Sequence, residues 1–225
     1  MNKCILCGQK ITFQISISFL LSLKPIKYKP LCDKCETQFE RINQEIICQQ
    51  CGREMEVAGI CDDCVKWQNV GNKLINRAVY KYNDAMKEYM HRYKFCGDYN
   101  LRKSFTDEFC SHIDTKKIIV PIPVSEETLA ERGFNQVIGL LAETKIVEAL
   151  IINQESKTRQ SSLNRKQRLK ASQVFEINDN MKDVIKDKEI IIIDDIYTTG
   201  TTMHHAAQVL QKNGVKSVQG LTLCR

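Results

Sequence analysis

The sequence lacks a long apolar run. The longest apolar-looking stretch near its start, residues 11–23, is interrupted by threonine, glutamine and serine, and it is too short and too polar to span a bilayer. The first residues, from Met1 to Cys4, contain no basic segment followed by an apolar one and no cleavage signal. We therefore expect no membrane insertion and a cytoplasmic, reducing location.

A strong excess of one charge is also missing. The 225 residues include 33 lysines and arginines against 27 acidic side chains, which gives a formal net charge of +6. This mild excess differs from that of a histone-like nucleic-acid binder. The apolar fraction of 43% is typical of a globular protein, and the length suits one ordinary α/β domain with a small additional module.

Cysteine, by contrast, is abundant, with 11 residues. In a reducing compartment, cysteine pairs bind metal more often than they form disulfides. Two Cys-x-x-Cys pairs supply the four thiolates of a tetrahedral zinc site, which leaves no open position for catalysis. The sequence therefore predicts two structural zinc ions, with disulfides or inert thiols as the alternative. The pairs are Cys4/Cys7, Cys32/Cys35, Cys48/Cys51 and Cys61/Cys64.

The four pairs define a double zinc ribbon over residues 1–66. Sequential pairing, with the first two pairs at one zinc and the last two at the other, is the simplest arrangement, and a crossed-over arrangement is the alternative. A module this small buries little core, so we expect it to need metal to fold. Alternation over residues 11–19 predicts a strand, and a short helix is expected at residues 36–43.

Outside the pairs, Cys96, Cys110 and Cys224 have no ligand spacing and are expected to be small buried or half-buried residues. Residues 67–78 are interpreted as a linker into a second domain, residues 67–225.

The second domain has the pattern of a parallel α/β sheet, because apolar runs of strand length alternate with helical segments. The run of four isoleucines at residues 190–193 predicts a strand buried on both faces. We expect strands at residues 117–124, 189–194 and 215–224, and helices at residues 84–92, 104–114, 134–150 and 202–212.

The most specific chemistry follows the isoleucine run. Two carboxylates end the strand, a short loop rich in threonine and glycine comes next, and a helix begins at once. Successive backbone amides at a helix N-terminus bind anions, and hydroxyls add further donors. The alternative is an ordinary turn with two acidic helix caps. His204 and His205, just beyond the loop, are expected on a solvated helix surface.

This segment resembles the PRPP-binding signature of type I phosphoribosyltransferases at every defining position. The resemblance implies that Asp194 and Asp195 bind the two ribose hydroxyls, directly or through magnesium, and that the loop binds the ribose 5-phosphate. The PRPP-binding residues implied are Asp194, Asp195, Thr198, Thr199, Gly200, Thr201 and Thr202.

Other segments resemble the ComF family of competence proteins, which combine a double zinc ribbon with a phosphoribosyltransferase-like domain. They are Val120-Pro121-Ile122-Pro123-Val124-Ser125, Arg132-Gly133-Phe134-Asn135-Gln136, Tyr93-Lys94-Phe95-Cys96-Gly97-Asp98, and Gln160-Ser161 with Arg165 and Arg168. Many family members carry an asparagine after the basic pair and then Gly-Ala-Phe, whereas this chain has Ala171-Ser172-Gln173-Val174-Phe175.

The resemblance implies a cytosolic factor of natural transformation that handles incoming single-stranded DNA together with proteins of the competence machinery. PRPP or a related ribose phosphate would then be a regulator of this factor, or the ribose-phosphate pocket would serve for binding alone. The alternative is an active, magnesium-dependent phosphoribosyltransferase with an unidentified nucleophile. The sequence contains a donor site but no recognisable pocket for a base.

Basic side chains are candidates for binding pyrophosphate. Residues 157–170 form a basic segment without an acid, which could close over pyrophosphate, bind single-stranded DNA or be a solvated surface. The segment has no aromatic side chain on which a base could stack, which favours the pyrophosphate role over the DNA role. The candidates are Lys94, Arg132, Arg159, Arg165 and Arg168, of which Lys94 could instead be a solvated lysine and Arg132 a domain-interface residue.

Overall fold

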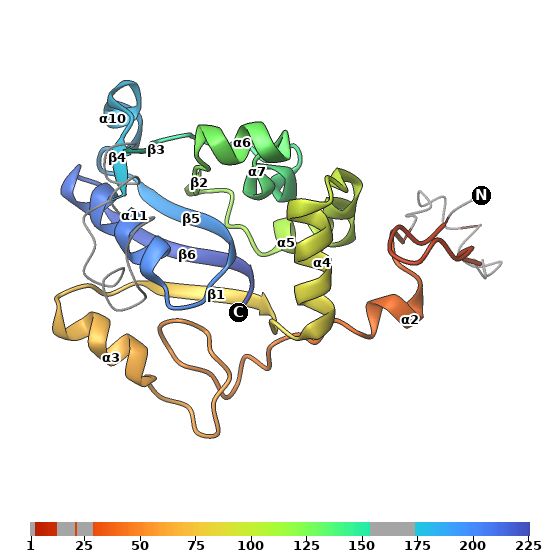
Figure 1. The fold of residues 1–225 in the computed structure, drawn as a ribbon. Helices are drawn as coiled ribbons and strands as arrows, with labels where there is room; N and C mark the ends of the chain where they lie inside the picture. Colours follow the sequence, from red (N-terminus) through yellow and green to blue (C-terminus); the bar gives the residue numbers. More distant parts are fainter. Residues whose placement is uncertain (1–2, 13–20, 22–28, 154–173) are drawn as a thin grey trace.

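A parallel sheet forms the centre of the protein. The computed structural model describes residues 3–12, 21, 29–153 and 174–225. Within them, the sheet has four strands in the order β1-β6-β5-β2, and every neighbouring pair is parallel (Figure 1). The predicted parallel α/β fold is therefore confirmed. The strands are β1 (Ile75–Tyr80), β2 (Ile118–Pro121), β5 (Glu189–Ile196) and β6 (Ser217–Cys224).

Strand β5 lies between two cores. Ile190 pairs with Ile118 of β2 and with Val218 of β6. Ile191 and Ile193 belong to the core on one face of the sheet. Ile190 and Ile192 belong to the core on the other face. A strand buried on both faces has no polar side, which explains the run of isoleucines.

Helices cover both faces of the sheet. One core contains buried side chains of α4 (Asp84–Phe95), α5 (Thr106–Ser111) and α7 (Gln136–Leu141), and the other contains those of α11 (Thr201–Lys212). The helices predicted at residues 84–92 and 202–212 are confirmed. α5 is shorter than the helix predicted at residues 104–114, because a 3-10 turn, η1 (Tyr99–Ser104), precedes it.

Smaller elements complete the described chain, and the sequence did not predict them. β3 (Leu150–Ile152) and β4 (Phe175–Ile177) form a two-stranded antiparallel sheet. Three short helical elements lie in the same half of the chain, namely α6 (Glu126–Arg132), η2 (Asp179–Met181) and α10 (Lys182–Ile185).

The helix predicted at residues 134–150 is correct only in its first part. α7 ends at Leu141, and Ala142 has a φ of 47° that no helix accommodates. Further along, the amide of Val147 donates to the carbonyl of Ile119, a residue of β2, at 2.8 Å. The apolar residues that imitated a helical period therefore pack against the edge of the sheet instead.

The short helix expected at residues 36–43 is wrong. The helix present, α2 (Asp33–Glu36), ends earlier, and Ile42 donates a backbone hydrogen bond to Val79 of β1 at 3.0 Å. The edge strand β1 offers backbone groups with which this segment pairs, so it runs extended.

The linker predicted at residues 67–78 is also wrong. α3 (Asp62–Asn69) and β1 occupy most of it. The domain division after residue 66, which falls inside α3, stays a prediction. Most of the strand predicted at residues 11–19 lies outside the described residues. The whole basic segment 157–170 also lies outside them.

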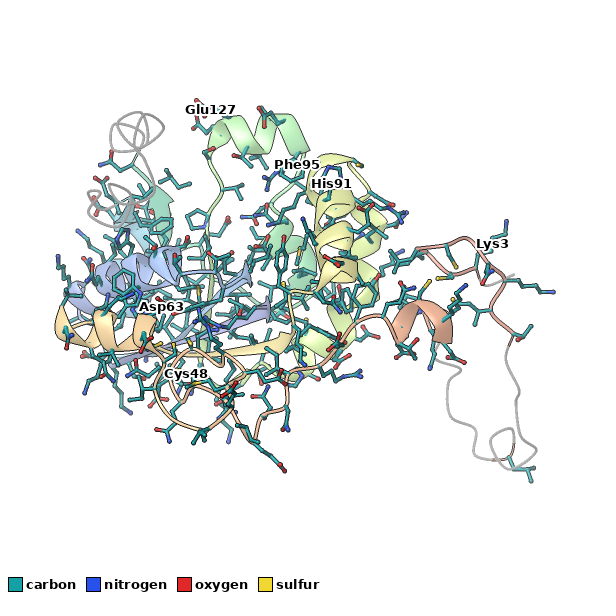
Figure 2. All side chains as sticks on the ribbon, turned by 60° about the horizontal axis from the view of Figure 1, so that its bottom comes forward. Lys3, Cys48, Asp63, His91, Phe95 and Glu127 are labelled. Carbon is teal, nitrogen blue, oxygen red and sulfur yellow. The ribbon has the colours of Figure 1, made fainter. Side chains whose placement is uncertain are left out.

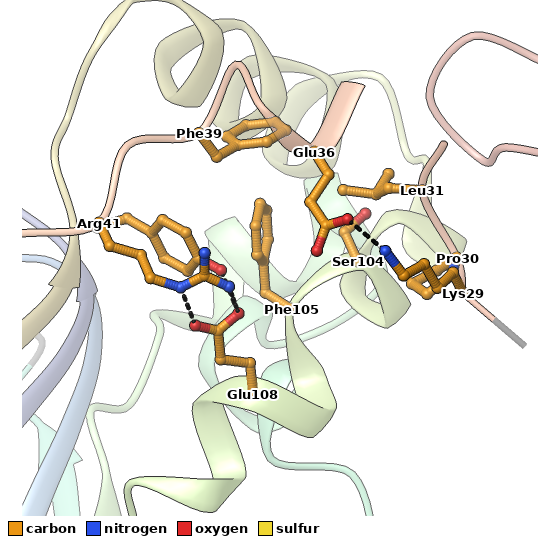
Figure 3. A pocket seen from close by; sticks show the side chains of 10 residues that line it. Lys29, Pro30, Leu31, Glu36, Phe39, Arg41, Ser104, Phe105 and Glu108 are labelled. Carbon is orange, nitrogen blue, oxygen red and sulfur yellow. Dashed lines mark hydrogen bonds and ion pairs between the residues drawn. The ribbon is translucent and has the colours of Figure 1, made fainter. Parts of the chain in front are cut away.

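An ion pair connects the N-terminal module to the main domain. The guanidinium of Arg41 binds both carboxylate oxygens of Glu108 on α5, at 2.7 and 2.9 Å (Figure 3). Such a bidentate contact fixes the relative orientation of its two partners. None of the helices in the described ranges is long and apolar enough to cross a bilayer.

Candidate functional site

The site is built at the edge where the parallel strands end. β5 ends at Ile196, and the candidate loop, residues 197–202, includes the first two residues of α11, which begins at Thr201. Gly200 has a φ of 81°, and a Cβ there would collide with the ring and hydroxyl of Tyr197 and crowd His204. Only glycine fits this position, because both the backbone conformation and the close approach exclude a side chain.

The candidate loop presents donors at the start of a helix. The first amides of α11 have no partner within the helix, and no acidic residue lies in its first turn. The hydroxyls of Thr199 and Thr201 lie 2.9 Å apart beside these amides. Amides, hydroxyls and the positive end of the helix dipole together make a site for an anion.

Two carboxylates lie buried immediately before the loop. Asp194 is 8% exposed and Asp195 4%. Burial, together with the neighbouring charge of Asp195, raises the pKa of Asp194 to about 8, although a hydrogen bond from the Asp195 amide and the charge of Lys94 oppose this shift. Asp194 is therefore largely protonated at neutral pH.

Lys94, at the C-terminal end of α4, neutralises the second carboxylate. Its Nζ lies 2.8 Å from Oδ2 of Asp195, and the two side chains are 14% and 5% exposed. The alternative that Lys94 is a solvated lysine is thus wrong. The structure brings Lys94 to the two carboxylates, although they lie 100 residues apart in the sequence.

Arg132 lies at the end of α6. Its Nη1 donates to Gln136 at 3.0 Å, and its guanidinium lies 5.0 Å from the ring centroid of Phe95, the residue after Lys94 (Figure 2 labels Phe95). The other three pyrophosphate candidates, Arg159, Arg165 and Arg168, lie outside the described residues.

The eight paired cysteines form two groups of four, in the sequential arrangement. Within each group the sulfur atoms all lie within 4.8 Å of one another. The Cys7–Cys32 sulfurs are 3.7 Å apart and the Cys51–Cys61 sulfurs 3.6 Å. A tetrahedron with Zn–S bonds of about 2.3 Å has sulfurs about 3.8 Å apart, so both groups fit zinc. The first group is Cys4, Cys7, Cys32 and Cys35, and the second is Cys48, Cys51, Cys61 and Cys64.

The two groups have different surroundings. All four cysteines of the second group belong to the same core as Tyr197 of the candidate loop and Met203 of α11. Cys4 and Cys35 of the first group belong to the other core, with Phe39. In Figure 2, Lys3 beside the first group and Cys48 of the second lie far apart.

The chain resembles known proteins over almost its full length. It is 37% identical over 225 residues to "Competence protein ComFC" of Streptococcus pneumoniae (strain ATCC BAA-255 / R6), covering 99% of this chain and 100% of that protein. It is 36% identical over 236 residues to "Competence protein ComFC" of Bacillus subtilis (strain 168), covering 99% and 94%. The chain belongs to the ComFC family of competence proteins.

The ComFC similarity agrees with the domain content. Residues 114–225 match the phosphoribosyl transferase domain family. Among solved structures, "Structure of the allosteric regulatory enzyme of purine biosynthesis" aligns over 56% of this chain and 26% of that chain, at 18% identity and a TM-score of 0.37. That similarity is too low to add to the assignment.

Around the loop of this ComFC family member, the sequence-based prediction was wrong for two histidines and did not single out Trp67. His204, expected on a solvated surface, is fully buried, and His205 is 8% exposed. Burial, with a smaller effect of His205, lowers the pKa of His204 to about 4, so its ring is neutral. Its Nε2 lies 3.3 Å from the hydroxyl of Tyr197. The indole of Trp67 stacks on the imidazole ring of His204, with ring centroids 4.2 Å apart. The only early signal was that Trp67 is the sole tryptophan.

The three unpaired cysteines differ from one another. Cys224 is buried and Cys110 half-buried, as predicted, but Cys96 is exposed. The prediction was wrong for Cys96 because α4 ends at Phe95, and the residue after it leaves the helix at the surface.

We expect the purified protein to contain close to two equivalents of zinc. Replacing Cys61 and Cys64 by serine should remove one equivalent, and replacing Cys4 and Cys7 should remove the other. Cys96→Ser is the matched control, because this thiol is exposed and belongs to neither group. Metal analysis measures the content, and chelation should lower the far-UV circular dichroism signal. About one equivalent in the wild type would contradict one of the two zinc sites, and none would contradict both.

The raised pKa of Asp194 makes stability depend on pH. Between its ordinary value of 3.8 and about 8, the folded state keeps a proton that the unfolded state releases, so this group favours folding less as the pH rises. Asp194→Asn should therefore gain stability relative to the wild type at pH 8 compared with pH 5. Urea unfolding at both pH values measures this. Asp183→Asn, at an exposed position, is the control. If Asp194→Asn differs from the wild type by the same free energy of unfolding at pH 5 and at pH 8, the raised pKa of Asp194 is contradicted.

Proposed function

We propose that this protein acts in the cytoplasm in DNA uptake during natural transformation, and that its candidate loop binds PRPP with magnesium. The observation that supports the ligand most directly is the succession of two buried carboxylates, a glycine-dependent loop and the start of α11 at one edge of a parallel sheet. Membership of a family of competence proteins supports the process.

Each part of the ligand has candidate partners. The first amides of α11 and the threonine hydroxyls would bind the 5-phosphate, because they combine donors with a positive helix end. Asp194 and Asp195 would bind the ribose hydroxyls or the magnesium ion, whose preferred ligands are oxygens. Lys94 lies against Asp195 and would turn to the pyrophosphate when a cation or hydroxyl takes its place. Arg132 is the second described candidate for that group.

Single-stranded DNA and proteins of the competence machinery are the proposed partners. The names of the relatives, which are competence proteins, support this part of the proposal. The basic segment 157–170 adds positive charge without acidic residues, as phosphate binding requires.

An active phosphoribosyltransferase is the second candidate function, and a cavity favours it. A pocket of about 480 Å³ lies beside Tyr197 and Thr198 and is also lined by Tyr82 and Arg225. Its volume is within the range of small-molecule sites, and aromatic and guanidinium groups can stack on a planar base. Release of pyrophosphate from PRPP in the presence of one of a panel of bases, or of DNA, would establish this function, and its absence throughout would leave the loop a binding site.

Replacing both carboxylates tests the ligand. Asp194→Asn with Asp195→Asn keeps the shape of both side chains and avoids a cavity beside Lys94. We expect PRPP with magnesium to bind about 100-fold more weakly or not at all, because hydrogen bonds to charged groups contribute roughly 1.5–3 kcal/mol each. Calorimetry measures the affinity, and thermal melting checks the fold. Asp179→Asn with Asp183→Asn, at exposed positions of the surface, is the control. Unchanged affinity in the double variant would refute the site.

Neutralising the basic segment separates its possible roles. If it binds single-stranded DNA, replacing four of its charges by glutamine should weaken DNA binding and flatten the salt dependence by about 0.7 per lost phosphate contact. If it closes over pyrophosphate, PRPP binding should weaken while DNA binding stays. Fluorescence anisotropy and calorimetry measure the two affinities, and no change in either would mean a solvated surface. The substitutions are Arg159→Gln, Arg165→Gln, Lys166→Gln and Arg168→Gln.

A further inference from the structure

Helix α3 connects the second cysteine group to the candidate loop. Cys64 and Trp67 lie three residues apart on this helix, so they are neighbours on its surface. The indole Nε1 of Trp67 donates to the backbone carbonyl of Thr199 at 3.1 Å. A residue of the helix that carries Cys64 thus contacts the main chain of the loop, and this contact spans 132 positions of the sequence.

The same indole also fixes the ring beneath the loop. Trp67 stacks on His204 with ring centroids 4.2 Å apart and an interplanar angle of 14°. The segment that follows α3 contributes as well, since the side chain of Asn72 donates to the carbonyl of His204 at 3.4 Å. His204 in turn lies against the Tyr197 hydroxyl. Both rings occupy the space that a Cβ at Gly200 would need, so the path of the loop depends on where these rings lie.

A second connection runs through Arg225. Its guanidinium lies 4.5 Å from the ring centroid of Tyr197. Its Nε and Nη1 are buried and have no acceptor in the described part of the chain. Four thiolates around a zinc ion carry a net charge of −2, and Tyr197, under the Arg225 guanidinium, packs in the same core as the four cysteines of the second group. A metal-loaded second group would compensate this half-buried cation and stabilise it over Tyr197.

A hydrogen bond between the first cysteine group and the main domain runs to α4 and not to the candidate loop, since Nη1 of Arg92 donates to the carbonyl of Leu6, between Cys4 and Cys7, at 3.1 Å. Cys4 and Cys35 pack in the core that contains Phe39 and Tyr89, on the side of α4. In Figure 1 its helix α2 lies beyond α4, at the far side from α3. The chain therefore supplies its own control, with two similar metal sites of which one adjoins the loop.

From these contacts we propose that Trp67 is a positioning residue for the candidate loop, and that metal in the second cysteine group, not in the first, sets the affinity of the loop for phosphorylated ligands. This inference rests on the proposed ligand site. It assigns the second zinc a role in ligand binding in addition to its role in folding.

The first test changes only the indole. Trp67→Phe keeps an aromatic ring over His204 but removes the donor to Thr199. We expect the affinity for ribose 5-phosphate, and for PRPP with magnesium, to fall about 3- to 10-fold, as for the loss of one neutral hydrogen bond. Trp67→Leu, which also removes the stack, should weaken both further. Zinc content should stay at the wild-type value in both variants. Wild-type affinity in both would overturn the proposal.

The second test compares the two metal sites in the full-length protein. Cys61→Ser should weaken ribose 5-phosphate binding at least 10-fold, whereas Cys32→Ser should leave it within about two-fold, although each variant loses one zinc. Trp67 is the only tryptophan, so its fluorescence should change in Cys61→Ser and not in Cys32→Ser. Equal effects of the two substitutions on affinity would overturn the proposal.

A ligand-free measurement separates this inference from the proposed function. Hydrogen exchange of the amides in the candidate loop and the first turn of α11 should be faster in Trp67→Phe and Cys61→Ser than in the wild type, and unchanged in Cys32→Ser. If the wild type binds neither ligand, the proposed function fails, and faster exchange still supports the positioning role. If Cys61→Ser does not fold, Trp67→Phe decides alone. Unchanged exchange in Trp67→Phe overturns the inference.

Discussion

Two carboxylates buried side by side at the end of β5 impose the main constraint on this structure. Adjacent negative charges in a poorly solvated position are costly unless they are neutralised. The fold meets this in two ways: Lys94 forms an ion pair with Asp195, and the raised pKa of Asp194 keeps that group protonated near neutrality. A divalent cation would supply the positive charge that allows Asp194 to ionise. The site is thus balanced in charge without ligand and suited to a cation when one arrives.

The parts of this site that depend on local chemistry could be predicted from the sequence. β5 was evident because a strand between two cores needs apolar residues on both faces. The start of α11 could be predicted because a short loop rich in glycine and threonine, placed directly after a buried strand, is typical of an anion-binding helix N-terminus. The two cysteine groups followed from the spacing of Cys-x-x-Cys pairs, and the structure adds that their arrangement is sequential.

The parts that depend on tertiary contacts could not be predicted in the same way. His204 follows a polar loop and looks like a surface residue until Trp67, distant in sequence, covers its ring. Residues 67–78 look like a linker because β1 is a short edge strand whose burial comes from its pairing with β6. The apolar residues after Leu141 imitate a helix, but Val147 instead bonds to the edge of β2. In each case the deciding partner lies far away along the chain.

The two cysteine groups therefore have unequal places in the fold, although their ligand sets are the same. The first stabilises a module that meets the main domain through α4 and the ion pair of Arg41 with Glu108. The second shares a core with Tyr197 and Met203, which lie three residues before and three residues after the loop's glycine. With zinc bound, a small module packed in this way would be held rigid by metal–thiolate bonds, and a rigid support is what a glycine-containing loop lacks on its own. On this proposal, conformational order in the loop is supplied by a segment around Trp67, 132 residues before Thr199 in the sequence.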